Sequence, residues 1–292
     1  MMLLLASDVP TDGANVREAD REHAEPFCHA KRAIQPLSGL MKLVERKPRA
    51  AFRQPWADEV ESRWDSSRHG LQETEMRSLR CQIFLDKSAS MDFGEGDANK
   101  FHYGRVLAAV LSEVMVRQHD APGLIVFGEQ ARQAVPTQAS RHHADEILHL
   151  LSQAQATGGT KIDRSLFQIV ETFSRRGMAV VISDFFTAND TALELLRLLN
   201  AQNQESIVFH VLAPEELDLP YDGEFIFEDS ETAEQLPVHI DDFRNEYQRR
   251  LSEFSERIKR ECVQLEIDYQ QLRTDAPLDV ALMAYLERRA AV

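Results

Sequence analysis

The stretch CQIFLDKSASMDFG, residues 81–94, combines a strand with the first polar groups of a candidate binding site. Its apolar run from Cys81 to Leu85 predicts a buried strand, which ends in Asp86. The hydroxyls of Ser88 and Ser90 follow, giving the pattern D-x-S-x-S. A carboxylate and two hydroxyls on one tight loop are hard oxygen ligands, which suit Mg²⁺ or Mn²⁺ better than Zn²⁺ or Cu²⁺. Serine and aspartate are also ordinary loop and cap residues, so the pattern needs support from elsewhere in the chain.

Two downstream segments provide that support. Thr160 lies in ATGGTKIDRSL, a glycine-rich turn that runs into a helical pattern. Asp184 ends the run MAVVIS, which is typical of a strand covered on both faces. In an open parallel sheet, ligands bind in the crevice beyond the carboxyl ends of the strands, so we expect Asp86 and Asp184 to project there together. We therefore predict a single divalent-cation site formed by Asp86, Ser88, Ser90, Thr160 and Asp184.

Helix and strand patterns alternate along most of the chain. This alternation favours an α/β fold with a doubly wound, mostly parallel, Rossmann-like sheet flanked by helices. Strands are expected over residues 81–85, 123–128, 133–136, 178–183, 206–212, 224–229 and 267–272. Helices are expected over residues 100–118, 142–154, 162–175, 190–201, 241–263 and 277–289.

The chain of 292 residues is long enough for one large domain or two modest ones. We divide it into a polar N-terminal extension, 1–80, partly disordered or packed on the core, and a domain, 81–292, whose core is followed by a C-terminal elaboration of helices and strands. The net charge is −15, and the first 80 residues hold 13 basic and 13 acidic side chains. The whole acidic excess thus falls on the second segment, which argues against nucleic acid as a main partner.

Cysteines and apolar runs bear on the cellular compartment. The three cysteines, Cys28, Cys81 and Cys262, are far apart, so no disulfide framework is implied. The apolar start, 1–6, is too short for a signal peptide and lacks a positive flank. No apolar run approaches the roughly 18 residues that a membrane span needs. We expect a cytoplasmic protein without a membrane span.

The five predicted site residues resemble the metal-ion-dependent adhesion site of a von Willebrand factor A domain. More narrowly, the chain is similar to the bacterial family catalogued as domain of unknown function 58. The stretches that carry this resemblance are LDKSASMDFG, Lys100 opening the first helix, GLIVFG, GGTKIDRSL, VVISDFF, EDSETAEQLPV and IDYQQLRTDAPLD. The match extends over residues 81–292, and upstream only RWDSSRHGLQETE (63–75) suggests the family's usual segment.

The resemblance implies a mechanism of binding. The hydroxyls of Ser88, Ser90 and Thr160 would hold the cation directly or through water, while Asp86 and Asp184 hydrogen-bond those ligands. An open coordination position would then accept an Asp or Glu of a protein partner. Relatives are commonly encoded beside MoxR-type AAA+ ATPases and are thought to act with them as adaptors in complex assembly or metal insertion. We therefore expect an interaction module and not an enzyme.

Two other functions compete with this interpretation. A metal-assisted phosphohydrolase with Asp86 as nucleophile would need a second acid close by, but position 88 is serine and Asp92 lies too far along the loop. An interaction module with a vestigial metal site also stays open. Within the loop, Lys87 is a cation that would weaken metal affinity by repulsion.

Overall fold

The computed structural model describes residues 3–6, 79–128, 133–156, 170, 177–186, 191–229 and 235–291. The chain divides into two compact units, Met1–Glu18 with Leu79–Val292, and Ala19–Ser78. All the described residues belong to the first of these units. The predicted division at residue 80 stays a prediction, because most of the extension lies outside the described residues.

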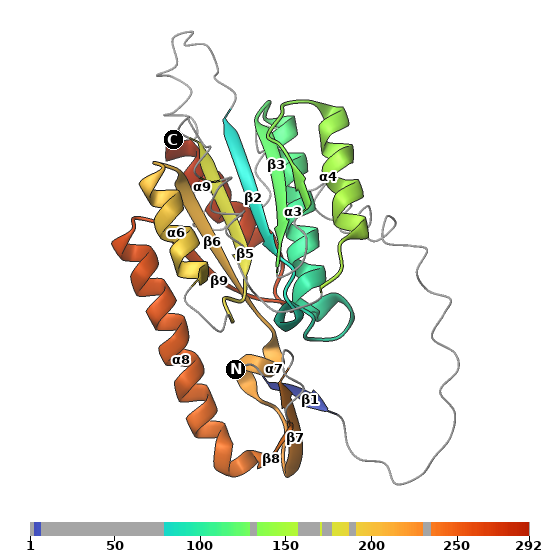
Figure 1. Cartoon of the computed structure of the whole chain (residues 1–292), viewed down its shortest axis with the longest axis vertical. Coiled ribbons are helices and arrows are strands. Elements are labelled where there is room, and N and C mark those ends of the chain that lie inside the picture. Colours follow the sequence, from blue (N-terminus) through green and yellow to red (C-terminus); the bar gives the residue numbers. More distant parts are fainter. Residues whose placement is uncertain are drawn as a thin grey trace, which may run out of the picture. The chain divides into compact units, whose positions relative to one another are not determined.

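A six-stranded sheet in the order β4-β3-β2-β5-β6-β9 carries the candidate site (Figure 1). Its strands are β2 (Arg80–Asp86), β3 (Ala121–Phe127), β4 (Gln133–Val135), β5 (Met178–Ser183), β6 (Glu205–Leu212) and β9 (Asp268–Arg273). Neighbours are parallel except β3 and β4, which run antiparallel. The strand order reverses at β2, whose partners are β3 and β5. Such a switch point is where open α/β sheets place ligand sites, and the predicted doubly wound fold is confirmed.

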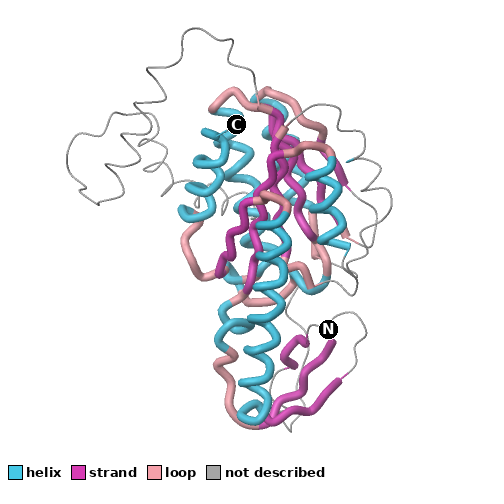
Figure 2. The backbone as a smooth tube through the Cα atoms, turned by 90° about the vertical axis from the view of Figure 1, so that its left-hand side faces the viewer, coloured by secondary structure: helices cyan, strands magenta, loops and turns pink. Residues whose placement is uncertain are grey.

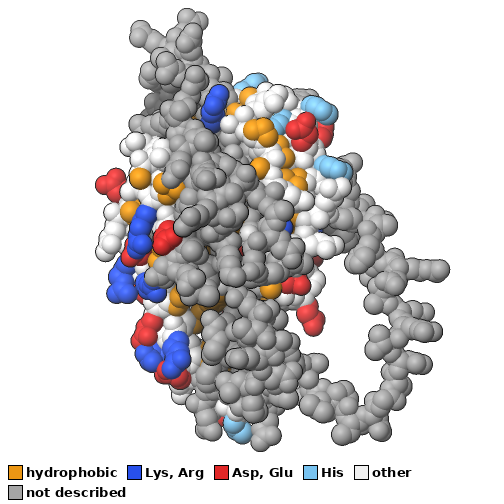
Figure 3. All heavy atoms as spheres, viewed as in Figure 1, with side chains coloured by type: hydrophobic (Ala, Val, Ile, Leu, Met, Phe, Trp, Pro, Cys, Tyr) orange, Lys and Arg blue, Asp and Glu red, His pale blue; other side chains and the backbone are white. Residues whose placement is uncertain are grey.

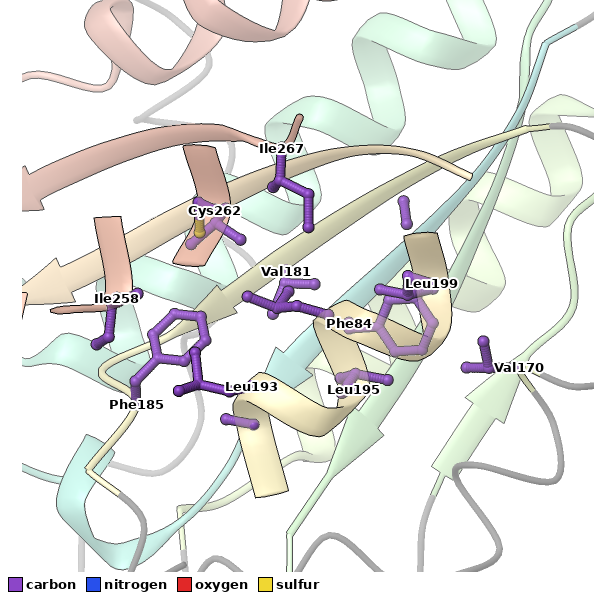
Figure 4. Close-up of a cluster of buried hydrophobic side chains, with 14 of the residues drawn as sticks. Phe84, Val170, Val181, Phe185, Leu193, Leu195, Leu199, Ile258, Cys262 and Ile267 are labelled. Carbon is purple, nitrogen blue, oxygen red and sulfur yellow. The ribbon is translucent and has the colours of Figure 1, made fainter. Parts of the chain in front are cut away.

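Helices cover both faces of this sheet because the central strands are apolar on both sides. On one face, α6 (Thr191–Ala201) and α8 (Ile240–Gln264) pack on Phe84 and Val181 (Figure 4). Successive strand residues point to opposite faces, so Leu85 and Ile182 serve the other side. There α3 (Lys100–Arg117) packs closely, since a Cβ built at Gly104 would lie 3.0 Å from Cδ1 of Leu85.

The start of α3 is fixed by its own loop. The side chain of Asn99 accepts a hydrogen bond of 2.9 Å from the backbone N–H of His102, which caps the helix. The backbone N–H of Lys100 donates to the carbonyl of Phe93 at 2.9 Å. These two bonds hold the first helical residue, Lys100, close to the end of β2.

Two further helices complete the layers around the sheet. α4 (Arg141–Gln153) contacts α3 and β3, and α9 (Asp279–Ala291) contacts β9 and β6. The outer side of α8 carries charges of both signs, visible along this helix in Figure 3, including the pair Arg250–Glu246. A second pair joins Arg197 of α6 to Glu261 of α8. Exposed pairs of this kind contribute little to stability, so burial of the apolar stripe determines where α8 packs.

A second, three-stranded sheet has the order β1-β7-β8 (Figure 2). Its antiparallel strands are β1 (Leu3–Ala6), β7 (Glu224–Asp229) and β8 (Gln235–His239). A short helix, α7 (Pro214–Asp218), lies between β6 and β7 in the chain.

The predicted elements agree with the observed ones within a few residues at their ends. Apart from two short 3-10 turns, three of the described elements were not predicted: β1, because the start of the chain was expected to lack regular structure, and α7 and β8, because the acidic, proline-punctuated residues 214–240 gave a signal only for the strand at 224–229. The helix expected over residues 162–175 lies outside the described residues apart from Val170.

Candidate metal centre

Asp86 stands at the carboxyl end of β2 and is fully buried. Its Oδ1 accepts a hydrogen bond of 2.9 Å from the backbone N–H of Ser88, and its Oδ2 accepts one of 2.6 Å from Oγ of Ser183. Both oxygens of this carboxylate are therefore held in fixed directions by neighbours from two adjacent strand ends.

The two loop hydroxyls lie beside this carboxylate. Ser88 and Ser90 are buried, and their Oγ atoms are 2.9 Å apart. Ser90 belongs to the short 3-10 turn Ala89–Met91, and its hydroxyl donates to Oδ1 of Asp184 at 3.1 Å. The loop after β2 is thus bonded to the residue that follows β5.

Asp184 is fully buried, and its two carboxylate oxygens have different neighbours. Oδ1 accepts from Ser90 and from the backbone N–H of Phe186, the latter at 3.0 Å. Oδ2 accepts a hydrogen bond of 2.7 Å from Nζ of Lys100. The backbone carbonyl of Asp184 lies 3.1 Å from Nε2 of His210 on β6.

The backbone just after Asp184 is strained. Phe185 has φ of 58°, which is rare for a bulky residue and costs about 1–3 kcal/mol. Its backbone N–H donates to Oγ of Ser183, and the next N–H donates to Oδ1 of Asp184. The ring of Phe185 is buried in the core and packs edge-on against His210. Burial of this ring in the core therefore offsets the cost of the strained backbone. That backbone conformation directs the N–H groups of Phe185 and Phe186 to the side chains of Ser183 and Asp184.

A buried ion pair completes the cluster. Nζ of Lys100 is 2.7 Å from Oδ2 of Asp184 and 2.7 Å from Oε1 of Glu216. Oε2 of Glu216 accepts from the backbone N–H of Ala213 at 2.8 Å, which fixes the start of α7. The ammonium also faces the rings of Phe93 and Phe186, at 5.6 and 5.0 Å from their centroids. Lys100 is fully buried, so its positive charge is stabilised by these protein groups and not by water.

The acid–base properties of these groups reflect their burial. Burial and the nearby Asp184 raise the pKa of Asp86 to about 6, and burial raises the pKa of Glu216. Burial alone would lower the pKa of Lys100, but Asp184 and Glu216 outweigh it and the net shift is upward. Burial lowers the pKa of His210 to about 4, so its imidazole is neutral at pH 7. The hydrogen-bonded cluster thus contains three carboxyl groups, those of Asp86, Asp184 and Glu216, and one ammonium, that of Lys100.

The donor set fits a hard divalent cation. Hydroxyl and carboxylate oxygens are the ligands that Mg²⁺ and Mn²⁺ prefer, and an excess of carboxyl groups over ammonium is what a divalent ion would neutralise. Within the described part of the chain, no group of three or more His, Cys, Asp or Glu could hold a metal ion. Any cation here would therefore depend on the hydroxyls of Ser88 and Ser90.

The structure brings together four of the five predicted site residues: Asp86, Ser88, Ser90 and Asp184. Thr160 lies outside the described residues. Four further residues of the cluster were not predicted from the sequence: Ser183, Lys100, Glu216 and His210. For Lys100, its position opening the first helix was a feature of the resemblance, whereas Glu216 carried no signal in its acidic surroundings. Lys87, the cation considered from the sequence, donates its backbone N–H to the carbonyl of Phe127 at 2.9 Å.

The mostly parallel, six-stranded sheet with helices on both faces is a doubly wound α/β domain, and the cluster of polar groups lies at its switch point. The chain belongs to the family described as protein of unknown function DUF58, which matches residues 63–257. The family predicted from the sequence is therefore confirmed.

Individual relatives are more distant. Uncharacterized proteins of Mycobacterium tuberculosis and Mycobacterium bovis are 28% identical over 168 residues, which are 56% of this chain and 52% of theirs. The chain thus spans about half the length of these curated relatives. Among solved structures, BatB from Bacteroides thetaiotaomicron is 14% identical with a TM-score of 0.46, covering 72% of this chain and 98% of that one. The SpRpn10 VWA domain is 17% identical with a TM-score of 0.32, covering 46% and 75%. In the described residues, no helix is long and apolar enough to cross a membrane.

Proposed function

We propose that this domain is a metal-dependent protein interaction module. Ser88, Ser90 and Thr160 would offer their hydroxyls to Mg²⁺ or Mn²⁺, and Asp86 and Asp184 would orient those hydroxyls. The bound ion would supply an electrophilic position for a carboxylate of the partner. The observation that carries the proposal is the chain of hydrogen bonds from Ser88 through Ser90 to Asp184, which aligns hard oxygen donors at the switch point of the sheet.

The chemistry of the ligands supports an open site. Neutral hydroxyls leave the ion more electrophilic than carboxylates would, and Mg²⁺ is seldom held by an all-protein cage. A partner's Asp or Glu can then complete the coordination. For the partner we propose a MoxR-type AAA+ ATPase, with the domain acting as an adaptor in complex assembly or metal insertion. That choice is supported by the family resemblance alone. The cytoplasmic location, which was expected from the cysteines and the short apolar runs of the sequence, stays a prediction.

Catalysis by Asp86 has weak support. Both oxygens of Asp86 accept hydrogen bonds, from the backbone N–H of Ser88 and from Oγ of Ser183, so this carboxylate is engaged as an acceptor and is not a free nucleophile. Asp92, the nearest candidate for a second acid, accepts a bond of 3.0 Å from the side chain of Asn99. Steady phosphatase turnover that Asp86→Ala abolishes would overturn the choice of a binding protein.

The first test is thermal unfolding in EDTA, Mg²⁺ or Mn²⁺. An ion at 100 times its Kd stabilises the native state by about 2.7 kcal/mol, which raises Tm by several degrees. We expect this shift in the wild type and its loss in Asp86→Ala and in the milder Ser90→Ala. Asp97→Ala is the matched control, because Asp97 is an exposed acid in the same loop, and it should keep the full shift.

The second test is capture of a purified MoxR-type AAA+ ATPase, with and without chelator. We expect capture in Mg²⁺ that is lost in EDTA and in Ser90→Ala. A metal shift without capture would leave a metal site but would contradict this partner. Absence of any metal shift in the wild type would contradict the proposed function.

A further inference from the structure

The burial of Lys100 needs a physical reason. Lysine is almost never fully buried unless it is paired, and burying an ion pair often stabilises a protein no more than apolar residues would. Lys100 nevertheless has no exposed surface and lies between Asp184 and Glu216 at hydrogen-bond distance from both. Its position within the candidate centre provides a reason that packing alone does not.

The contacts of Asp184 show where this ammonium acts. Oδ1 is bonded to Ser90 and to the N–H of Phe186, whereas Oδ2 is bonded to Lys100. A carboxylate held on both oxygens cannot rotate without breaking a bond on each side. Lys100 therefore fixes the orientation in which Oδ1 faces the hydroxyls.

We propose that Lys100 is a tethered cation that keeps this cluster assembled when no divalent ion is bound, and that it sets how tightly such an ion binds. In this role Lys100 is a positioning residue, because it acts through Asp184. The inference rests on the proposed metal site. It adds that a residue of the chain competes electrostatically with the ion for the charge of Asp184.

The sign of the effect follows from Coulomb's law. A divalent ion on the Oδ1 side and the ammonium on the Oδ2 side would share one carboxylate, so the two cations repel each other across a few ångströms of poorly screened interior. Removing the ammonium should tighten metal binding, while the metal-free state loses the bond from Lys100 to Oδ2. Glu216 has the opposite role, since its negative charge offsets the ammonium.

Two substitutions, each of which nearly preserves the size of the side chain, therefore have opposite expected effects on metal affinity. Lys100→Met removes the positive charge and should tighten Mn²⁺ binding by about tenfold or more. Glu216→Gln removes a negative charge next to the same ammonium and should weaken Mn²⁺ binding. Both variants disturb a buried pair, so loss of packing or stability alone cannot produce changes of opposite sign.

The experiment measures Mn²⁺ affinity by calorimetry and Tm in EDTA and in saturating Mn²⁺, for the wild type and both variants. For Lys100→Met we expect a Tm several degrees below the wild type in EDTA, with Mn²⁺ restoring most of the difference. Tighter Mn²⁺ binding by Lys100→Met than by the wild type supports the inference. If Lys100→Met binds Mn²⁺ and the wild type binds too weakly to measure, the inference still holds and only the proposed function fails.

Other outcomes contradict the inference. Mn²⁺ binding by the wild type with unchanged affinity in Lys100→Met would make the pair an ordinary structural contact and would leave the proposed function intact. If neither protein binds Mn²⁺, the proposed function fails and this inference fails with it. Should Lys100→Met not fold, Glu216→Gln decides, because affinity equal to or tighter than that of the wild type would overturn the inference.

Discussion

Ser183 donates a hydrogen bond of 2.6 Å from its Oγ to Oδ2 of Asp86, joining the ends of the neighbouring strands β5 and β2. The same Oγ accepts from the backbone N–H of Phe185 at 2.9 Å. This serine therefore holds the carboxylate of Asp86 and the strained backbone after Asp184 at once.

We predict that Ser183→Ala destabilises the domain. A hydrogen bond to a charged group contributes about 1.5–3 kcal/mol, and its loss leaves a buried carboxylate short of a donor. Because the bond favours ionised Asp86, the loss should be largest at pH 7 and shrink as the pH falls below about 6, the pKa of Asp86. Urea unfolding at pH 7 and pH 5 measures both effects.

Ser112→Ala is the matched control for this prediction. Ser112 is equally buried, but its hydroxyl donates to the carbonyl of Ala108 within α3. Loss of such a neutral bond costs about 1 kcal/mol or less and has no titrating partner. An equal, pH-independent loss in the two variants would contradict the role of Ser183.

His210 and Asp86 should oppose each other in the pH dependence of stability. The pKa of His210 is about 4 against an ordinary 6.5, because of burial and the nearby Lys100, so between these values the native state holds fewer protons than the unfolded chain. Its contribution to stability is thus lost as the pH falls from 6.5 to 4, by about 3 kcal/mol. Asp86 has a pKa of about 6 against 3.8, so the native state holds more protons and gains stability as the pH falls through 6.

Two substitutions separate these contributions. Relative to the wild type, His210→Gln should become more stable on acidification from pH 7 to pH 4.5, and Asp86→Asn should become less stable. The measurement is the free energy of unfolding in urea at both pH values, taken as a difference between each variant and the wild type. Parallel pH curves for all three proteins would show that neither group titrates as expected.

Gly94 should be the least replaceable glycine of the loop before α3. Its φ is +93°, and a Cβ there would lie 2.6 Å from the backbone carbonyl oxygen of Ala98. Gly94→Ala combines left-handed strain with a clash against backbone, and we expect a loss of about 2–4 kcal/mol. Gly96 also has positive φ, +54°, but no atom within 4 Å of such a Cβ, so Gly96→Ala should cost only about 1 kcal/mol. Similar Tm values for the two variants would contradict this difference.

Phe84 tests the core under the site. It is fully buried in β2 and belongs to the cluster formed with α6 and α8. Phe84→Ala should cost about 3–5 kcal/mol, the usual range for such a cavity. Val263→Ala, at an exposed position of α8, should change stability by no more than about 0.5 kcal/mol. Denaturant unfolding of both variants checks the contrast.

Local patterns predicted the fold well where each element carries its own signal. The segment around Phe84 is rich in apolar residues because β2 is covered on both faces, and such a run can be recognised from consecutive residues alone. Asp86 and Asp184 could be placed together because parallel strands end at one edge of a sheet. Ser88 and Ser90 could be assigned to the same site because they follow Asp86 by only two and four residues in the sequence.

The remainder depends on contacts between distant residues, which leave no local pattern. Lys100 and Glu216 are 116 residues apart, and Glu216 lies in a stretch whose acids and prolines look like a solvated linker. The strand Leu3–Ala6 likewise has its partner at Ile226–Asp229. A charged residue that is buried by pairing with a residue distant in the chain cannot be distinguished, from its local sequence, from a charged residue on the surface.

The hydrogen bonds that build the centre link residues 94, 97 and 116 positions apart in the chain. Closing loops of that length is slow and comes after local structure has formed, so we expect these bonds to form late in folding. Substitutions at Ser90, Ser183 or Lys100 should accordingly accelerate unfolding and leave the refolding rate nearly unchanged. The lifetime of the folded domain, more than the speed at which it is reached, is what these residues control.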